Sequence, residues 1–424
     1  MNVWLPQDQA FWYLKRDAIP PCRENLMVDV AIIGGGMAGL SAAQAFNKRG
    51  KKVAVLEQYY CGSGATGKSS GFITPNAELS FTDFSKRYNA ETAHMIWDFI
   101  TSGVDDIRNN IQQYGFACDY TAQDTLMLAN TQSAYDDLAI EYHNLAKFGY
   151  KTALYDKKTV CDYIGSKQYY GGMSYAETFG INGYAYCQEM KRHLQNAGVI
   201  VYEETAVTAL NDHALTTPHA TITADYIVVC TDRFMPELGL LTQDVYHVQT
   251  FLMISEPLTD AQIRAIFPEK NRLVWDSELI YTYFRLTGDK RLLLGGGSIA
   301  TTYAAKADHE NVRMYNQLTR YFNARFPDLN VQFKQFWPGL IGISKDIAPL
   351  CGRDKDKPYQ FYIAGAAGLS IAAALGRYSA ENLLEGNTAL DPYFSPYRSF
   401  PIGGMVQSII GTKLSFALSN IMKK

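Results

Sequence analysis

A glycine-rich segment between two short apolar runs constrains the fold of this chain more than any other feature. The runs VDVAII (28–33) and KKVAVLE (51–57) are rich in β-branched residues, which is typical of buried strands. Between them, GGGMAGLSAAQAFNKRG (34–50) has small residues at helical spacing and predicts a helix. Strand, helix and strand in this order predict a β-α-β unit of a Rossmann-like α/β fold.

The turn after the first strand carries the pattern GxGxxG, which is typical of dinucleotide binding. The first glycine makes the tight turn, the second lets a pyrophosphate approach the backbone, and the third lets helix and strand touch. The helix N-terminus offers free N–H groups to phosphates, and an acid 18 residues after the last glycine can accept from ribose hydroxyls. The alternative is a purely structural turn. The predicted contacts are Gly34, Gly36, Met37, Ala38, Gly39, Glu57 and Gln58.

A second glycine-rich loop follows at once. GSGATGKS (62–69) matches the P-loop pattern of ATPases, but a P-loop opens a helix at its Lys-Ser pair. Gly71 and Pro75 would obstruct a helix there, so we expect a loop that wraps a long dinucleotide instead. A second glycine-rich loop around the dinucleotide suits FAD better than NAD. The predicted contacts in this loop are Gly64, Ala65, Thr66, Ser69, Ser70 and Gly71.

These motifs resemble the FAD-dependent amine and amino-acid oxidase superfamily, which includes glycine, sarcosine and D-amino-acid oxidases. Residues 63–71 match the second-loop form S-x-x-x-G-[RK]-x-x-G of that family. Three later stretches add to the resemblance: 207–234, IYTYFRLTGDKRLLLGGG (280–297), and 337–386, which contains the C-terminal flavin motif. The nearest likeness is to the gamma-glutamylputrescine oxidoreductase branch, and it covers nearly the whole chain.

The resemblance implies further flavin contacts and also shows departures. Leu369 and Ala372 stand where relatives carry His and Lys or Thr, and CTDRF (230–234) replaces AxGAW. GLIGIS (339–344) lacks the cysteine that attaches flavin in some relatives, so we expect non-covalent FAD. Ser370 is expected to cap a helix that starts near Ile371. The implied contacts are Val207, Cys230, Thr231, Gly342, Gly368, Leu369, Ser370 and Ile371.

The fold class that we predict is α/β, with a discontinuous Rossmann-like FAD-binding domain and an α+β substrate domain whose sheet covers the flavin. The FAD-binding domain is assigned to 26–88, 156–238 and 335–394, and the substrate domain to 89–155 and 239–334. Residues 1–25 form an N-terminal arm. Residues 395–424 form a C-terminal tail helix with apolar residues on one side, which packs on its own protein, on a second copy or on a membrane surface.

Three residues are candidates for a catalytic role. Tyr283 and Arg285 alternate on one strand face with Tyr281, so the tyrosines could enclose a substrate and Arg285 could bind its carboxylate. The alternative for Arg285 is an ion pair at the domain interface. Lys68 could act near the flavin ring or activate oxygen, or it could be a neighbour of the pyrophosphate or a solvated lysine. The scattered histidines fall in no motif, and no metal site is predicted.

Composition limits the remaining function classes. With 39 basic and 42 acidic residues, the chain does not have the charge of a nucleic-acid binder. Seven scattered cysteines without a CxxC pair favour reduced thiols, and no run is apolar enough to span a membrane, so we expect a cytoplasmic protein.

The resemblance implies an oxidoreductase that acts on the C–N bond of a small amine or amino acid, with oxygen or another electron acceptor. One alternative is a dehydrogenase that passes electrons to a quinone or protein. The other is a non-catalytic FAD-binding protein.

Overall fold

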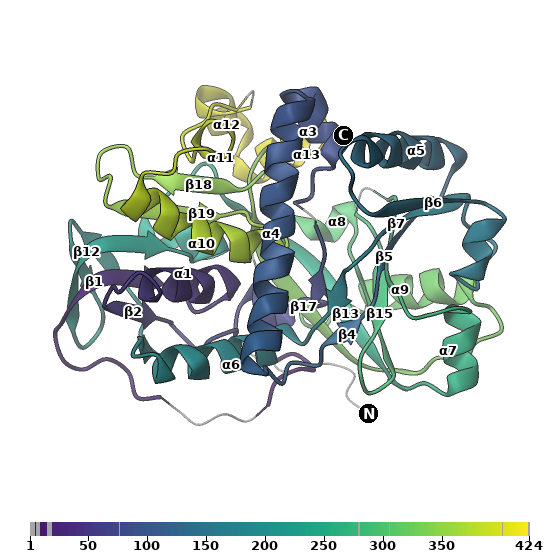
Figure 1. Ribbon diagram of the computed structural model, residues 1–424, viewed down its shortest axis with the longest axis horizontal. Coiled ribbons are helices and arrows are strands. Elements are labelled where there is room, and N and C mark those ends of the chain that lie inside the picture. Colours follow the sequence, from purple (N-terminus) through teal and green to yellow (C-terminus); the bar gives the residue numbers. More distant parts are fainter. Residues whose placement is uncertain are drawn as a thin grey trace.

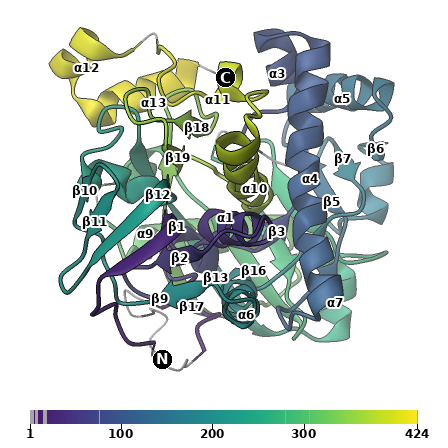
Figure 2. The same cartoon turned by 60° about the vertical axis from the view of Figure 1, so that its left-hand side comes forward.

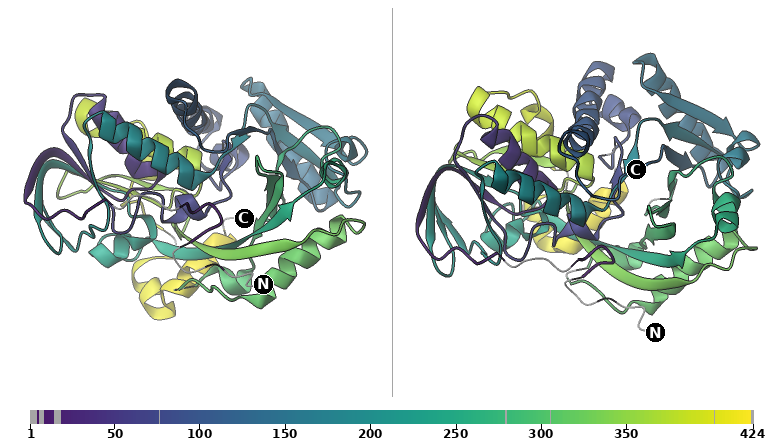
Figure 3. Two further views of the ribbon diagram at one scale, coloured as in Figure 1. Left: turned by 90° about the horizontal axis from the view of Figure 1, so that it is seen from below. Right: turned by 60° about the horizontal axis from the view of Figure 1, so that its bottom comes forward.

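The computed structural model describes residues 5, 9–14, 19–75, 77–278, 280–304, 306–400 and 402–422. Two large sheets form two lobes that lie side by side (Figure 1, Figure 3). The long helix α4 (Ala90–Tyr114) runs between the lobes in the view of Figure 1. The chain crosses between the lobes several times, so each lobe is built from segments that are distant in sequence.

The first sheet contains the β-α-β unit. Its strand order is β10-β11-β12-β1-β2-β9, and β19 pairs with β12 and β18. β1 pairs in parallel with β2 and β12, which brings the carboxyl ends of these strands to one edge. The strands are β1 (Leu26–Ile33), β2 (Val53–Leu56), β9 (Ile200–Tyr202), β10 (Ala209–Asn211), β11 (Ala214–Thr216), β12 (Thr221–Val229), β18 (Leu350–Arg353) and β19 (Gln360–Ala364).

Helices α1 (Met37–Asn47), α6 (Gly183–Asn196) and α10 (Leu369–Glu385) belong to this lobe, and α1 and α10 lie together on the sheet (Figure 2). Their backbones touch, because a Cβ added at Gly376 would lie 2.3 Å from the carbonyl oxygen of Ala38. Helix α4 packs on α10 in the same way, since a Cβ at Gly103 would meet the carbonyl oxygen of Ser370 at 2.0 Å. Small residues therefore set these helix distances.

The second sheet has the order β17-β13-β16-β15-β14-β5-β7-β6. Its strands are β5 (Thr125–Leu128), β6 (Thr152–Asp156), β7 (Gly171–Tyr175), β13 (Tyr246–Pro257), β14 (Leu273–Asp276), β15 (Tyr283–Leu286), β16 (Arg291–Gly296) and β17 (Phe333–Ile343). The helices of this lobe are α5 (Gln132–Lys147), α7 (Asp260–Ile266) and α9 (Val312–Arg325). Hydrophobic side chains of β13, β15 and β16 pack with those of α9 in its core.

A small third sheet and several short helices complete the fold. Strands β3 (Phe72–Ile73), β4 (Thr121–Ala122) and β8 (Phe179–Gly180) form a small third sheet. The remaining short elements are α2 (Ala65–Lys68), α3 (Phe81–Arg87), α8 (Ile299–Thr302), α11 (Asp391–Phe394), α12 (Gly404–Ile410), α13 (Thr412–Met422), η1 (Thr159–Asp162) and η2 (Asp232–Leu238).

The strand pairing corrects several expected boundaries. β7 and most of β17 fall in ranges assigned to the FAD-binding domain, but both belong to the second sheet. α4 falls in a range assigned to the substrate domain, but it packs on α10 of the first lobe. The expected single tail helix is broken at Gly411, whose φ is 83°, and forms α12 and α13 instead.

A buried carboxylate ties three distant segments of the chain. Asp346 follows β17 and accepts hydrogen bonds from Arg398, at 2.5 and 2.9 Å, and from Arg87 at the end of α3. Burial alone would raise the pKa of Asp346, but Arg398 and Arg87 lower it to about 2. Removing a cation from this group would leave a buried charge without its main partner.

We predict that Arg398→Met lowers the free energy of unfolding at pH 7 by about 3–5 kcal/mol. The folded-state pKa of Asp346 lies below its ordinary value of 3.8, so the stabilisation is present above pH 3.8 and is lost as the pH falls towards 2. Urea unfolding across this range should show the difference shrinking. As a control, Lys357→Met removes an exposed ion pair with Asp212 and should leave the free energy of unfolding close to that of the wild type. Equal losses in the free energy of unfolding for Arg398→Met and Lys357→Met would contradict this prediction.

Candidate cofactor and active site

The GxGxxG turn lies at the carboxyl edge of the first sheet, between β1 and α1. Gly34 has a φ of 108°, and a Cβ there would lie 2.7 Å from the carbonyl oxygen of Cys230 at the end of β12. The Thr66 hydroxyl accepts from the N–H of Met37 at 3.1 Å, so the second loop touches the start of α1. The two glycine-rich loops are therefore adjacent.

Gly36 and Gly39 differ in what a side chain would meet. A Cβ at Gly39 would lie 1.9 Å from the carbonyl oxygen of Gly34, so the fold itself requires this glycine. A Cβ at Gly36 would meet only the Thr66 hydroxyl, at 3.3 Å. The protein alone does not require a glycine at 36, which indicates that the space serves a ligand.

Glu57 directly follows β2, beside this turn. Its carboxylate accepts from the N–H groups of Gly35 at 2.7 Å and Tyr59 at 2.9 Å. Burial raises the pKa of Glu57, while these N–H groups lower it. Gln58 follows in a half-buried position. The segment after β9 lies beside Glu57, because the N–H of Thr205 donates to the Glu57 carbonyl. Val207 lies two residues further along this segment.

Three consecutive carbonyls of the second loop are each held by a large side chain. The indole N–H of Trp337 donates to Lys68, the indole N–H of Trp12 donates to Ser69, and Nε of Arg285 donates to the third carbonyl, that of Ser70. The lengths are 3.1, 3.1 and 2.7 Å. The loop is thus clamped from the N-terminal arm, β15 and β17.

The conformation of this loop corrects one expectation in part. A helical turn does open, as the four-residue α2. It starts at Ala65 after Gly64, before the Lys-Ser pair, and the chain becomes extended at Ser69. The contact expected at Gly71 is backbone packing, because a Cβ there would lie 1.8 Å from the carbonyl oxygen of Ile181.

Arg285 is not placed to bind a substrate carboxylate, which corrects that expectation. It is fully buried, and besides Ser70 its guanidinium donates to the carbonyls of Leu286 at 3.0 Å and Ile181 at 2.6 Å. Burial lowers its pKa to about 10. Backbone carbonyls are its hydrogen-bond partners, while the Asp119 carboxylate acts on it at longer range and raises its pKa. Its role in this geometry is to position the loop.

Asp232 joins two segments that the sequence places far apart. It follows Cys230 and Thr231 after β12 and has a φ of 49°. Its carboxylate accepts from the N–H of Gly342 on β17 at 2.6 Å and from that of Gly365 after β19 at 3.0 Å. Both glycines lie in the segments that resemble the flavin motif. The departure CTDRF was the only sequence signal for this contact.

Helix α10 begins earlier than expected. Its N-cap is Gly368, with a φ of 133°, and its first residue is Leu369. Ser370 is therefore inside the first turn, followed by Ile371, and does not cap the helix. The hydroxyls of Ser370 and Thr231 are buried without a hydrogen-bond partner among the described residues. Such atoms need a polar partner, which a bound ligand would provide.

The two helix N-termini suit an extended dinucleotide. At about 1.5 Å per residue, the start of α10 lies about 10 Å along its axis from Gly376, where it touches α1 near the GxGxxG turn. The N-terminus of α1 can thus receive the pyrophosphate, while the N-terminus of α10 meets the far end of the cofactor. The open space at Gly36 and the two partnerless hydroxyls fit such a group.

Aromatic side chains gather where the second sheet meets the cofactor loops. Phe72, directly after the second loop, has its ring centroid 6.0 Å from those of both Trp275 and Tyr283. The hydroxyl of Tyr281 donates to the carboxylate of Glu78 at 2.7 Å. Burial raises the pKa of Tyr283 to about 12, so its phenol is neutral near pH 7. The cluster combines aromatic faces with one carboxylate.

Lys68 lies between the loop and the second sheet. Its side chain is half-buried, and a Cβ at Gly339 of β17 would lie 4.0 Å from that of Lys68. Burial and then the nearby Lys68 lower the pKa of His309. Trp337, whose indole N–H donates to the Lys68 carbonyl, is fully buried. No cluster of three or more metal-binding side chains occurs in the described part of the chain.

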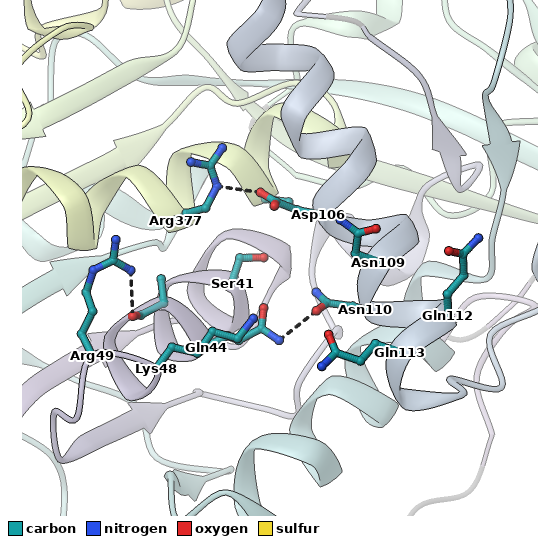
Figure 4. A pocket seen from close by; sticks show the side chains of 12 residues that line it. Ser41, Gln44, Lys48, Arg49, Asp106, Asn109, Asn110, Gln112, Gln113 and Arg377 are labelled. Atoms are coloured by element: carbon teal, nitrogen blue, oxygen red, sulfur yellow. Dashed lines mark hydrogen bonds and ion pairs between the residues drawn. The ribbon is translucent and has the colours of Figure 1, made fainter.

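A cleft of about 520 Å³ lies elsewhere, between α1, α4 and α10 (Figure 4). Arg377 pairs with Asp106 at 2.8 Å, and the amide of Gln44 donates to Asn110 at 2.9 Å. The α1 residues that line it start at Ser41, beyond the helix N-terminus, so the cleft is separate from the glycine-rich turn.

These features define a Rossmann-type dinucleotide-binding protein with a second, sheet-based lobe. The model of the family "FAD dependent oxidoreductase" (DAO) matches residues 29–382, and the chain belongs to this family. FAD, expected from the two loops, is therefore its cofactor, and the expected α/β fold class is confirmed. When bound, the flavin supplies hydride acceptance. Among the helices that the structure describes, none is both long and apolar enough to cross a membrane.

Relatives and solved structures agree with this assignment. The chain is 26% identical over 420 residues to "Probable oxidoreductase OrdL" of Haemophilus influenzae, covering 96% of this chain and 94% of the relative. It is 27% identical over 391 residues to gamma-glutamylputrescine oxidoreductase of Escherichia coli, covering 90% and 89%. Glycine oxidase from Geobacillus kaustophilus has a similar fold, with a TM-score of 0.76, 20% identity and coverage of 89% and 100%.

We predict that Gly36→Ala weakens FAD binding without a matching loss of folding stability. The methyl group would occupy the approach path of the pyrophosphate, at a cost of about 1–3 kcal/mol, or roughly tenfold to hundredfold in Kd. Gly39→Ala is the control, because its Cβ meets the Gly34 backbone and should destabilise the apoprotein by about 3 kcal/mol. Flavin titration and apoprotein melting separate the two effects. Full flavin affinity in Gly36→Ala would contradict the assignment.

We also predict that Asp232→Gly lowers both thermal stability and FAD affinity. Glycine relieves the positive φ but removes the acceptor of two N–H groups, each bond contributing about 1.5–3 kcal/mol. Asp232→Asn keeps one side-chain oxygen and should be intermediate. Melting and flavin titration of both variants check this order. A Gly variant as stable as the wild type would show that the carboxylate does not join these segments.

Proposed function

We propose that this protein oxidises the C–N bond of a small amine or amino acid. The observation that carries the proposal is the aromatic cluster with Glu78 beside the cofactor loops. The names of the relatives support the same class, since one is a gamma-glutamylputrescine oxidoreductase and another is "Glycine oxidase". FAD is held without a covalent bond, because residues 339–344 contain no cysteine and Leu369 replaces the family histidine.

The residues around this cluster bind and orient the substrate. Aromatic faces attract an ammonium group, so Trp275, Tyr281 and Tyr283 favour a cationic substrate. The Glu78 carboxylate, held by Tyr281, adds opposite charge. Tyr283 keeps its proton near pH 7 and hydrogen-bonds with Thr250 of β13, which fixes the orientation of its ring.

Backbone groups and Lys68 act on the flavin side. The N-terminus of α10 presents the N–H groups of Leu369, Ser370 and Ile371, with partial positive charge. These N–H groups replace the side-chain donor that is missing at Ala372. Lys68, which lies between the second loop and β17, would favour negative charge on the cofactor and the approach of oxygen. Buried Trp337 excludes water from behind the second loop.

The electron acceptor defines the alternatives. An oxidase passes electrons to oxygen, whereas a dehydrogenase passes them to a quinone or protein. Exposed apolar side chains on α12 and α13, such as Ile409 and Leu414, favour contact with a membrane and so support the dehydrogenase. Oxygen consumption with peroxide formation separates the two enzymes, and failure of every amine to reduce the flavin would favour a non-catalytic FAD-binding protein.

We predict that anaerobic addition of the correct amine bleaches the bound flavin. The screen should contain polyamines, gamma-glutamyl amines, N-methyl amino acids, and D- and L-amino acids. Glu78→Gln keeps the hydrogen-bond acceptor for Tyr281 but removes its charge, so it should raise KM roughly fivefold for a substrate with a second cationic group. KM for a singly charged amine should change less. No bleaching with any class would overturn the proposed function.

A further inference from the structure

The C-terminal helices α12 and α13 present apolar side chains to solvent. Twelve large apolar side chains are exposed among the described residues, and five of them lie between positions 406 and 421. Their exposed fractions are 48% for Val406, 78% for Ile409, 49% for Leu414, 40% for Leu418 and 48% for Ile421. The last three are spaced four and three residues apart, so they share one face of α13. Such a concentration marks an interaction surface.

The opposite face of these helices is polar and is anchored to the body of the protein. The Asn420 amide donates to the carbonyls of Ser344 at 3.2 Å and Lys345 at 2.8 Å, and its oxygen accepts from Tyr303 at 2.9 Å. On α12, the amide of Gln407 donates to the carbonyl of Gln243 at 3.0 Å. These bonds fix which side faces outward, so the apolar side cannot turn inward without breaking them.

One buried aromatic residue supports the same orientation. Phe416 is fully buried, with its ring centroid 5.5 Å from that of Tyr246 on β13 and 5.5 Å from the Lys345 ammonium. The neighbouring Ser415 and Ser419 are buried as well. The protein therefore already uses one face of α13, and only the Leu414 face is left uncovered.

The charge of this part of the chain is one-sided. No Asp or Glu occurs after Asp391, whereas the same stretch contains Lys413, Lys423 and Lys424, besides Arg398, whose charge is already paired with the buried Asp346. A contact between two identical copies would bring like charges together, because a two-fold interface pairs the same surface with itself. An anionic lipid surface instead complements both the cations and the apolar side chains.

We propose that α12 and α13 form a membrane-docking surface that lies flat on an anionic lipid bilayer. Val406, Ile409, Leu414, Leu418 and Ile421 enter the interface between headgroups and acyl chains, and Lys413 contacts the headgroups. Both helices lie at one corner of the molecule (Figure 2), where the flat surface of a bilayer can contact them. This inference does not rest on the proposed amine oxidation, and each can fail without the other.

The test is co-sedimentation of the FAD-loaded protein with vesicles. Vesicles of phosphatidylcholine with phosphatidylglycerol should bind the wild type more tightly than vesicles of phosphatidylcholine alone. The triple variant Leu414→Ser, Leu418→Ser, Ile421→Ser should lose roughly tenfold or more in partitioning. Lys413→Glu should lose roughly fivefold, and only with the anionic vesicles.

The matched control carries Ile140→Ser and Val312→Ser, which change apolar side chains of similar exposure, 50% and 56%, outside the tail. It should bind like the wild type. Flavin content and melting temperature of the triple variant should match the wild type, since the substituted side chains face solvent. Absence of binding by the wild type would overturn the proposal. A wild-type dimer that the triple variant dissociates, without vesicle binding, would assign the surface to a second copy instead.

Discussion

The close contact between α1 and α10 is the constraint on which the cofactor site depends. These helices come from opposite ends of the chain, and their backbones meet where Gly376 lies against the carbonyl of Ala38. A side chain at Gly376 would push the helices apart, and the N-terminus of α10 would then move away from the GxGxxG turn. Gly103 sets the distance of α4 from α10 by the same device. Backbone contacts of this kind tolerate little variation, since interiors are close-packed.

The second glycine-rich loop depends on contacts from the second sheet and from the N-terminal arm. Trp12, Trp337 and Arg285 each donate to one carbonyl between positions 68 and 70. A loop whose carbonyls are held on one side can present its opposite side to a ligand in one conformation. This preorganisation limits the entropy lost on binding. Arg285 thus serves the site through the loop, although it is not placed to touch a substrate.

Apolar side chains are packed against one another near the cofactor loops but are exposed to solvent on the tail. Near the cofactor loops, aromatic side chains such as Phe72 and Trp275 pack against one another at the boundary of the lobes. On α13, Leu414 and its neighbours stay in contact with solvent because polar residues anchor the other face. For the tail, hydrophobic periodicity predicts a one-sided helix but does not say which side is already covered. Only the partners of Asn420 and Phe416 show which side is already covered.

Local pattern was sufficient to predict the β-α-β unit, its three glycines and the acid at Glu57, because each of these depends on near neighbours in the sequence. The family resemblance implied the cofactor class and the discontinuous fold. The start of α10 was misplaced by two residues, since the cap is Gly368 in a backbone conformation that favours glycine, and a serine nearby looked like a better cap.

Long-range contacts were decided by the tertiary structure alone. The contacts of Asp232 with Gly342 and Gly365, and those of Trp337 and Arg285 with the second loop, join segments more than 100 residues apart. The bond from Arg285 to Ile181 does the same. The residue types and the local alternation of apolar and polar residues can be read from a sequence. The sequence does not state which distant carbonyl a buried donor will reach, because that depends on the packing of whole sheets and helices.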